Sequence, residues 1–332
     1  MKIKVAVVGL GKMGLMHSCI FNMMDDVELV AVCEINGLVR KFAKKMIPNI
    51  AFVENLEELK IMALDALCIT TPPSSHFLLI KTSYEKKIAQ HIFTEKPLAI
   101  NNIQAEELIS LASRTGGVNM VGYHRRFSVT FCKAKQLLES GAIGYPMSFK
   151  GHAYSADFLK AKTAKQAINR GGVIEDSGCH VIDIALWLFG DMEPIHASVK
   201  TIIGEDSEDE AYIEVKTAGG LIGELNASWC KEGYRLPDMC LSIIGDKGTL
   251  MVNEDNVQLT INGIKNIWYK HDLNDVVPFF IGGSEYQRQD QMFIKAIKEG
   301  IKAEPNFYTA AKIHKMVDAV NLMARSQNNE NR

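Results

Sequence analysis

Hydrophobic runs and amphipathic segments alternate over the first 120 residues of the chain. Short runs such as Val5–Val8 and Ala66–Thr70 are apolar throughout, and each precedes a longer segment whose apolar residues have helical spacing. Strands without polar alternation are typical of a parallel sheet covered by helices on both faces. The pattern therefore predicts a doubly wound α/β domain. The expected strands are Val5–Val8, Glu28–Cys33, Ala66–Thr70, His91–Thr94 and Val118–Gly122, with helices at 12–24, 36–46, 74–88 and 101–114.

The pattern changes after Tyr123. β-rich segments follow one another from residue 194 to 271, joined by short turns such as Asn262-Gly263. Strands joined by short turns pair antiparallel, so we expect an α+β domain with a large open antiparallel sheet. The other expected elements are a strand at 145–154 and helices at about 128–140, 177–189, 285–299 and 307–325.

A chain of 332 residues exceeds what one hydrophobic core usually organises. We expect a doubly wound α/β domain over residues 1–123 and an α+β domain over residues 124–332. Apolar residues occur on both sides of one predicted strand, at Leu241, Ile243 and Ile244. Sheet-to-sheet self-association would cover them, which suggests a homodimer or homotetramer.

Composition narrows the class of partner. The chain has 37 Lys and Arg against 39 Asp and Glu, a balance that argues against binding to nucleic acid or to an anionic membrane. No apolar run reaches 18 residues, and the N-terminus has no signal-peptide pattern. The seven cysteines form no Cys-x-x-Cys pair, which indicates reduced thiols and a cytoplasmic location. A small-molecule substrate is expected.

Gly9-x-Gly11-x-x-Gly14 follows the first predicted strand and opens a helix that includes Lys12 and Met13. Gly9 permits a tight turn, Gly11 lets the backbone approach a pyrophosphate, and Gly14 lets the helix pack on the strand. The free N–H groups and dipole of the helix N-terminus would then hold the phosphates. A Gly-rich turn that merely closes a βαβ unit is the alternative.

Glu34 lies at the end of the second predicted strand, twenty residues after Gly14. A carboxylate at this place accepts hydrogen bonds from the ribose hydroxyls and repels a 2′-phosphate, which favours NAD over NADP. Arg40 and Lys41 follow one helical turn or more later and could reach a phosphate, so NADP stays open.

Two further segments end strands at the carboxyl edge of the predicted sheet, where ligands bind in such folds. Thr70-Thr71-Pro72 leads to His76, which is either a ligand contact or a packed residue near a helix N-terminus. Glu95-Lys96-Pro97 follows the next strand along the chain. Burial and a neighbouring cationic nicotinamide would lower the pKa of Lys96 and suit it to catalysis. A solvated turn lysine is the alternative.

Asp176 and His180 are four residues apart and share one face if the helix begins near Asp176. Histidine is suited to proton transfer near neutral pH, and a carboxylate one turn away can orient it. A helix cap and a packed histidine form the alternative. A metal site with Asp183 is not expected, because no matching ligand spacing occurs elsewhere.

These motifs in this order resemble the Gfo/Idh/MocA oxidoreductases over residues 3 to about 325. The resemblance implies a Rossmann domain, a second domain whose open sheet mediates oligomers, and reversible NAD(P)-dependent oxidation of a secondary alcohol on a sugar or cyclitol. The motifs that carry it are Gly9-x-Gly11-x-x-Gly14, Glu34, Thr71-Pro72 with His76, Glu95-Lys96-Pro97, Tyr123-His124-Arg125-Arg126-Phe127, and Gly171-Gly172 with Asp176-x-x-x-His180-x-x-Asp183 and Trp187-x-x-Gly190.

The resemblance also implies residue roles. Lys96 and His180 form the catalytic pair, and Asp176 assists them. The cofactor would contact Gly9, Gly11, Lys12, Met13, Gly14, Glu34, Thr70, Thr71, Pro72, His76, Glu95 and Lys96. On the substrate side we expect Lys96, Asp176 and His180, with Arg126, Tyr154, Asn169 and Arg170 as further candidates near the domain junction or in the polar stretch before Gly171.

Two other functions are compatible with this fold. One is a glycoside hydrolase in which bound NAD transiently oxidises the substrate, and the other is a non-catalytic NAD-binding regulator. Lys96, Asp176 and His180 together favour the dehydrogenase, because a pure binder needs no acid–base pair. The identity of the sugar or cyclitol, and the direction of the reaction, are not encoded in any spacing.

Overall fold

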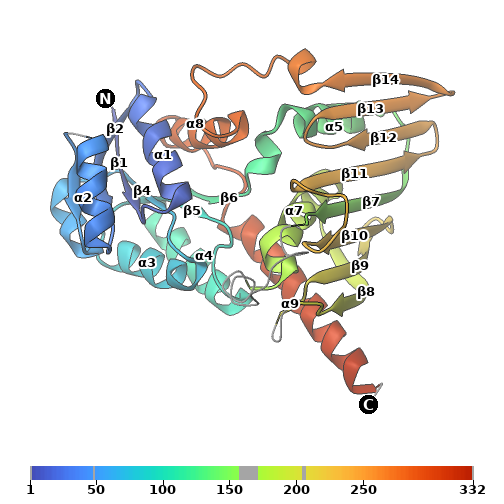
Figure 1. Cartoon of the computed structure of the whole chain (residues 1–332), viewed down its shortest axis with the longest axis horizontal. Coiled ribbons are helices and arrows are strands. Elements are labelled where there is room, and N and C mark those ends of the chain that lie inside the picture. The colour runs from blue at the N-terminus through green and yellow to red at the C-terminus, as the bar shows by residue number, and fades with distance from the viewer. Residues whose placement is uncertain (1, 48, 157–170, 204–206, 331–332) are drawn as a thin grey trace. The chain divides into compact units, whose positions relative to one another are not determined.

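Six parallel strands form the sheet of the first structural unit, which comprises residues 1–124 and 276–314 (Figure 1). The computed structural model describes residues 2–47, 49–156, 171–203 and 207–330. The strand order is β3-β2-β1-β4-β5-β6, so the order reverses between β1 and β4, where ligands bind in doubly wound folds. The strands are β1 (Ile3–Val8), β2 (Val27–Cys33), β3 (Ala51–Val53), β4 (Ala66–Ile69), β5 (His91–Glu95) and β6 (Asn119–Gly122).

Burial explains why these strands read as continuous apolar runs. All four residues of β4 are buried, and so are the last four of β1, because helices cover both faces of the sheet. The short strand β3 and the 3-10 helix η1 (Leu56–Met62) were not predicted, since three residues give no readable period. The helices of this unit are α1 (Lys12–Met23), α2 (Gly37–Met46), α3 (Pro73–Glu85), α4 (Asn102–Thr115) and α8 (Ser284–Glu299).

Residues 276–314 belong to the first unit although they follow the second unit in sequence. The sequence pattern places them in the expected second domain, because helical periodicity shows an apolar face but not the surface on which that face packs. Helix α8 contacts α1 and β6. It therefore brings residues that are distant in sequence against the helix that follows the Gly-rich turn.

Eight strands form the sheet of the second unit, which comprises residues 125–275 and 315–332 (Figure 1). The order is β14-β13-β12-β11-β7-β10-β9-β8. Six of the neighbouring pairs are antiparallel as expected, but β7 and β10 are parallel, so the sheet is mixed. The strands are β7 (Pro146–Tyr154), β8 (Met192–Lys200), β9 (Glu210–Thr217), β10 (Ile222–Ser228), β11 (Asp238–Gly245), β12 (Gly248–Val252), β13 (Asn256–Ile261) and β14 (Ile264–Tyr269).

The parallel pair corrects the antiparallel expectation. No hairpin joins β7 to β10, since a helix and the strands β8 and β9 lie between them in sequence, so the short-turn rule does not apply to them. One face of the sheet is covered by a π-helical turn, η3 (Ile174–Gly178), and α7 (Cys179–Phe189). The remaining helices are η2 (His124–Phe127), α5 (Val129–Glu139), η4 (Lys270–Leu273) and α9 (Phe307–Glu330), which extends from the first unit into the second.

Two kinds of functional feature, membrane-spanning helices and metal-ligand clusters, are absent from the described residues. None of their helices combines the length and the apolar composition that crossing a membrane requires. The same ranges contain no group of three or more His, Cys, Asp or Glu side chains that could hold a metal ion.

Candidate functional site

The Gly-rich turn leaves β1 with the geometry of a phosphate-binding loop. Gly9 has a φ of +89°, and a Cβ there would lie 2.7 Å from the Thr71 side chain. A Cβ at Gly14 would lie 2.0 Å from the Gly9 carbonyl oxygen, so this glycine lets α1 approach the turn. Gly11 is exposed, and no atom would meet a Cβ there within 4 Å. That open surface fits the close approach of a dinucleotide pyrophosphate.

The N-terminus of helix α1 lies at the same Gly-rich turn. Gly11 is the N-cap, no side chain caps the helix, and the first turn carries no acidic residue. Uncapped N–H groups and the positive end of the dipole favour an anion. Lys12 is exposed and Met13 half-buried beside this N-terminus.

Glu34 is fixed next to the Gly-rich turn. One carboxylate oxygen accepts the N–H of Leu10 at 2.7 Å, and the other accepts the N–H of Asn36 at 2.8 Å. Arg40 turns back to Glu54, with an Nη2–Oε2 distance of 2.6 Å, and its Nη1 donates to the carbonyl of Ile35 at 2.8 Å. The guanidinium is therefore already engaged, whereas reading a 2′-phosphate would require it to leave these partners.

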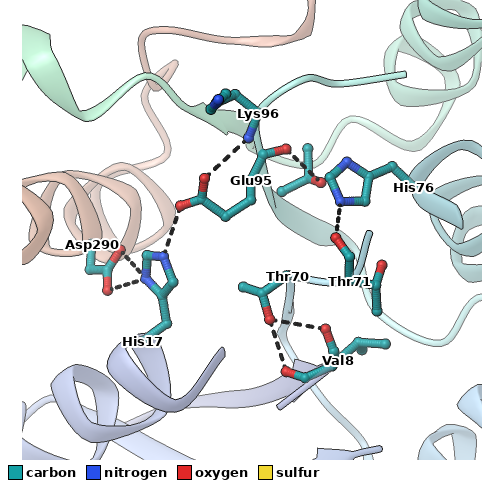
Figure 2. Close-up of polar contacts among 10 residues, drawn as sticks. Val8, His17, Thr70, Thr71, His76, Glu95, Lys96 and Asp290 are labelled. Atoms are coloured by element: carbon teal, nitrogen blue, oxygen red, sulfur yellow. Dashed lines mark hydrogen bonds and ion pairs between the residues drawn. The ribbon is translucent and has the colours of Figure 1, made fainter. Parts of the chain in front are cut away.

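The loops after β4 and β5 are tied together by His76. Its ring nitrogens lie 2.8 Å from the Thr71 carbonyl oxygen and 2.7 Å from the Pro97 carbonyl oxygen (Figure 2). Burial lowers the pKa of His76, so the neutral ring donates to one of these carbonyls at a time. The Thr70 hydroxyl donates to the carbonyls of Val8 and Gly9 at 3.1 and 2.9 Å. Pro72, the N-cap of α3, is exposed.

Glu95 is buried at the end of β5 and lies between a histidine and the catalytic candidate Lys96. Its Oε1 accepts a hydrogen bond from His17 Nε2 at 3.1 Å, and its Oε2 lies 3.3 Å from the backbone N–H of Lys96. The other ring nitrogen of His17 lies 2.8 and 3.0 Å from the two carboxylate oxygens of Asp290 (Figure 2). The Lys96 side chain points away from these carboxylates in the same view.

The charge on His17 follows from its two partners. Burial by itself would lower the pKa of His17, but the adjacent carboxylates of Asp290 and Glu95 outweigh it and raise that pKa to about 10. Burial in turn raises the pKa of Asp290, an effect that His17 opposes. Near neutral pH the cluster holds an imidazolium between two carboxylates.

Asp176 and His180 lie on neighbouring turns of the second unit. Asp176 is in the π-helical turn η3, and His180 is the second residue of α7. Both are half-buried, and their spacing of four residues places them on the same side. Glu208 contacts the start of η3, where its Oε1 accepts a hydrogen bond from the N–H of Ile174 at 3.1 Å. Burial raises the pKa of Glu208. A Cβ at Gly172 would overlap this carboxyl group.

The further substrate candidates are not gathered around His180. Tyr154 alternates with the buried Ala153 on β7, so its side chain lies on the face of the sheet opposite α7. Arg126 is buried, and its Nε and Nη2 both donate to Asp183, at distances from 2.6 to 3.0 Å. Asn169 and Arg170 lie outside the described residues.

Sequence reasoning missed three polar residues of these sites: His17, Asp290 and Glu208. His17 carried a signal, because a histidine lies on the apolar face of α1 that also includes Ile20 and Phe21. Asp290 and Glu208 carried no such signal in the sequence. Asp290, for example, is 273 residues away from the ring that it binds.

Two family models match the chain. Residues 3–123 match the NAD-binding Rossmann fold of the oxidoreductase family, and residues 131–251 match the GFO/IDH/MocA C-terminal domain. The chain belongs to the Gfo/Idh/MocA oxidoreductases. This confirms the family and fold class that the motifs predicted.

Relatives of this Gfo/Idh/MocA protein act on cyclitols and sugars. Myo-inositol 2-dehydrogenase of Thermotoga maritima is 24% identical over 77% of this chain and 76% of its own length. Scyllo-inositol 2-dehydrogenase (NAD(+)) of Bacillus subtilis is 26% identical over 76% and 74%. The structure of levoglucosan dehydrogenase with NADH and levoglucosan has a TM-score of 0.88 at 21% identity, over 98% of both chains, and so shares the fold.

Proposed function

We propose that this protein is an NAD-dependent dehydrogenase that acts on a secondary hydroxyl group of an uncharged sugar or cyclitol. The observation that carries the proposal is the set of residues that follow the strands at the carboxyl edge of the first sheet. Lys96 follows β5 at the same carboxyl edge at which the Gly-rich turn follows β1 and Glu34 follows β2. Alcohol oxidation requires, beside the dinucleotide site, a side chain that can hydrogen-bond the substrate oxygen and stabilise the charge that develops on it.

We assign cofactor binding to the groups at this edge. Gly11 and the N-terminus of α1 would hold the pyrophosphate, and Glu34 would accept the ribose hydroxyls. The engagement of Arg40 with Glu54 supports NAD over NADP. The proposed contacts are Gly9, Gly11, Lys12, Met13, Gly14, Glu34, Thr70, Thr71, Pro72, His76, Glu95 and Lys96.

Bound NAD supplies the acceptor for the hydride of the carbinol carbon. In the proposed mechanism, His180 removes the proton of the substrate hydroxyl. Lys96 donates a hydrogen bond to the same oxygen and stabilises the negative charge that develops on it. Asp176 orients His180 and stabilises its protonated form. In the reverse direction, His180 returns the proton to the oxygen.

Two arginines of the second unit, Arg125 and Arg126, support an uncharged substrate. Arg125 lies 2.5 Å from Glu254, and the guanidinium of Arg126 is buried against Asp183. Cations that are already paired offer little to a phosphate or carboxylate. We therefore assign Arg126 to holding the fold near α7 rather than to contacting the substrate. Inositols and neutral aldoses, which resemble the substrates named for the relatives, are the compounds to test first.

Two properties outside the site complete the proposal. We infer a homodimer or homotetramer formed through the outer face of the second sheet, where Ile244 and Tyr269 are about half exposed. We also propose a cytoplasmic location, since the cysteines are unbridged.

Absorbance of reduced nicotinamide tests the function directly. Purified protein is incubated with NAD or NADP and a panel of inositols, aldoses, sugar phosphates and nucleotide sugars. We expect NADH formation with a neutral polyol, and a loss of about 100-fold or more in kcat for Lys96→Ala. Lys44→Ala, which removes an exposed lysine of α2, is the control. A panel without NADH formation, although NAD binds, would favour the hydrolase or the regulator.

A further inference from the structure

We propose that His17 and Asp290 are positioning residues: they hold the Glu95 carboxylate ionised and fixed, and Glu95 in turn fixes the backbone from which Lys96 acts. The inference rests on the proposed function, because it assigns Lys96 to the reaction. It concerns two residues that no motif of the sequence singled out.

A chain of hydrogen bonds immobilises Glu95. It runs from Asp290 of α8 through His17 of α1 to Glu95 at the end of β5 (Figure 2). On the remaining side lies Gly122 of β6, where a Cβ would approach the Glu95 carboxyl group to 2.9 Å. The carboxylate therefore has one place to lie, next to the backbone N–H of Lys96 at 3.3 Å.

The charges in this cluster do not cancel. One imidazolium faces two carboxylates, and all three side chains are buried. Two further titratable groups that face them, the Cys68 thiol and the His76 ring, are neutral near pH 7. Burial raises the pKa of the Cys68 thiol, and burial lowers the pKa of His76. The rings of Phe21 and Phe93 form an apolar wall beside His17, at centroid distances of 6.3 and 5.2 Å.

Removal of the imidazolium would therefore leave two buried carboxylates facing one another. Like charges in a desolvated site cannot both stay ionised, so one of them takes up a proton. A protonated Glu95 can reorient, and Lys96 would lose its fixed support. Converting Asp290 to its amide in the same protein removes the competing charge and lets Glu95 ionise again.

This reasoning predicts a rescue by a second substitution. In His17→Gln we expect kcat to fall about 10- to 100-fold, as for a displaced catalytic group, while KM for NAD changes little. The pH dependence of kcat/KM should gain an acidic limb that the wild type lacks, because the two buried carboxyl groups then compete for a proton that must be lost. In His17→Gln/Asp290→Asn that limb should disappear and kcat should recover several-fold. Asp290→Asn alone should lose less than His17→Gln.

A merely structural role would look different. Equal losses in the single and double variants, without a new limb in the pH profile, would overturn the inference. Thermal unfolding and NAD binding are measured for each variant, so that a misfolded protein is recognised.

Nitrogen-15 NMR of labelled histidine gives a measurement that does not depend on turnover. With the His17 signal identified by its absence in His17→Gln, we expect both ring nitrogens to be protonated at pH 8. A neutral ring at that pH would also overturn the inference. If the wild type transfers no hydride to any compound of the panel, the proposed function fails, and the ring signal still decides whether His17 holds Glu95 ionised.

Discussion

Arg126 in the second unit and His17 in the first are both buried cations, but Arg126 faces one carboxylate and His17 faces two. The Arg126–Asp183 pair is neutral as a whole and cannot lose its charge near physiological pH, because a guanidinium does not titrate there. The His17 cluster keeps a surplus negative charge and contains a cation that can deprotonate. The first arrangement is suited to holding a fold together, and the second to holding a reactive neighbour in a defined state.

Breaking the neutral pair should give the largest effect on stability. Arg126→Met removes the guanidinium that the fully buried Asp183 carboxylate faces, which should lower the free energy of unfolding by about 3–5 kcal/mol. Urea unfolding measures the loss. Arg126→Met/Asp183→Leu, which removes both charges, should restore most of it. A loss below about 1 kcal/mol in the single variant would contradict a structural role for Arg126.

A methyl group placed against the Glu95 carboxylate should lower the stability by an intermediate amount. Gly122→Ala places a methyl group 2.9 Å from the Glu95 carboxyl group, and we expect a loss of about 1–3 kcal/mol. Gly219→Ala is the matched control, since a Cβ there meets only Thr217 Oγ1 at 3.9 Å. Denaturation midpoints of the two variants should differ clearly. Similar midpoints would mean that Glu95 can move aside.

The titratable cluster should also make stability depend on pH. The pKa of His17 is raised from 6.5 to about 10 in the folded protein, so its contribution is complete below about pH 6.5 and is lost as the pH rises towards 10. Its slope can reach about 1.4 kcal/mol per pH unit. Urea midpoints between pH 7 and 10 should fall more steeply for the wild type than for His17→Gln/Asp290→Asn, which lacks both the ring and the second carboxyl group. Parallel curves would show that the ring is not charged.

The smallest effect is expected where a pair is only partly buried. Arg125 and Glu254 lie 2.5 Å apart with side chains 17% and 33% exposed, so solvent screens this pair more than Arg126 and Asp183, whose side chains are 8% and 0% exposed. Arg125→Met should cost about 1 kcal/mol or less, as measured by the same urea titration. A loss as large as that of Arg126→Met would remove the distinction between the two neighbouring arginines.

Much of the first unit could be predicted because its signals are local. Continuous apolar strands, three glycines and Glu34 lie within 34 residues and predict the cofactor edge without knowledge of any distant contact. The Asp290–His17–Glu95 chain could not be predicted in this way, since nothing in helix 284–299 indicates which helix it packs against.

The second unit shows a different limit of the sequence. Its strands were located from turns and alternation, but the central place of β7 depends on pairings far apart in the chain. The sequence does not show on which face of the sheet Tyr154 lies, and the reason is local. The inward residues before it, Gly151 and Ala153, are too small to read as an apolar face. Tyr154 thus passed as a substrate candidate although it lies on the outer face.

The return of residues 276–314 to the first unit has a consequence for protein synthesis. A ribosome that adds about 5–20 residues per second needs roughly 15–55 s to proceed from His17 to Asp290. Until then the nascent chain carries a Gly-rich turn, Glu95 and Lys96 without the helix that completes their surroundings. All of the second sheet emerges in that interval. The amino-terminal unit therefore begins first but is completed only after the second sheet has been synthesised, and a truncated chain that ends before α8 would retain the binding motifs but not the cluster behind Lys96.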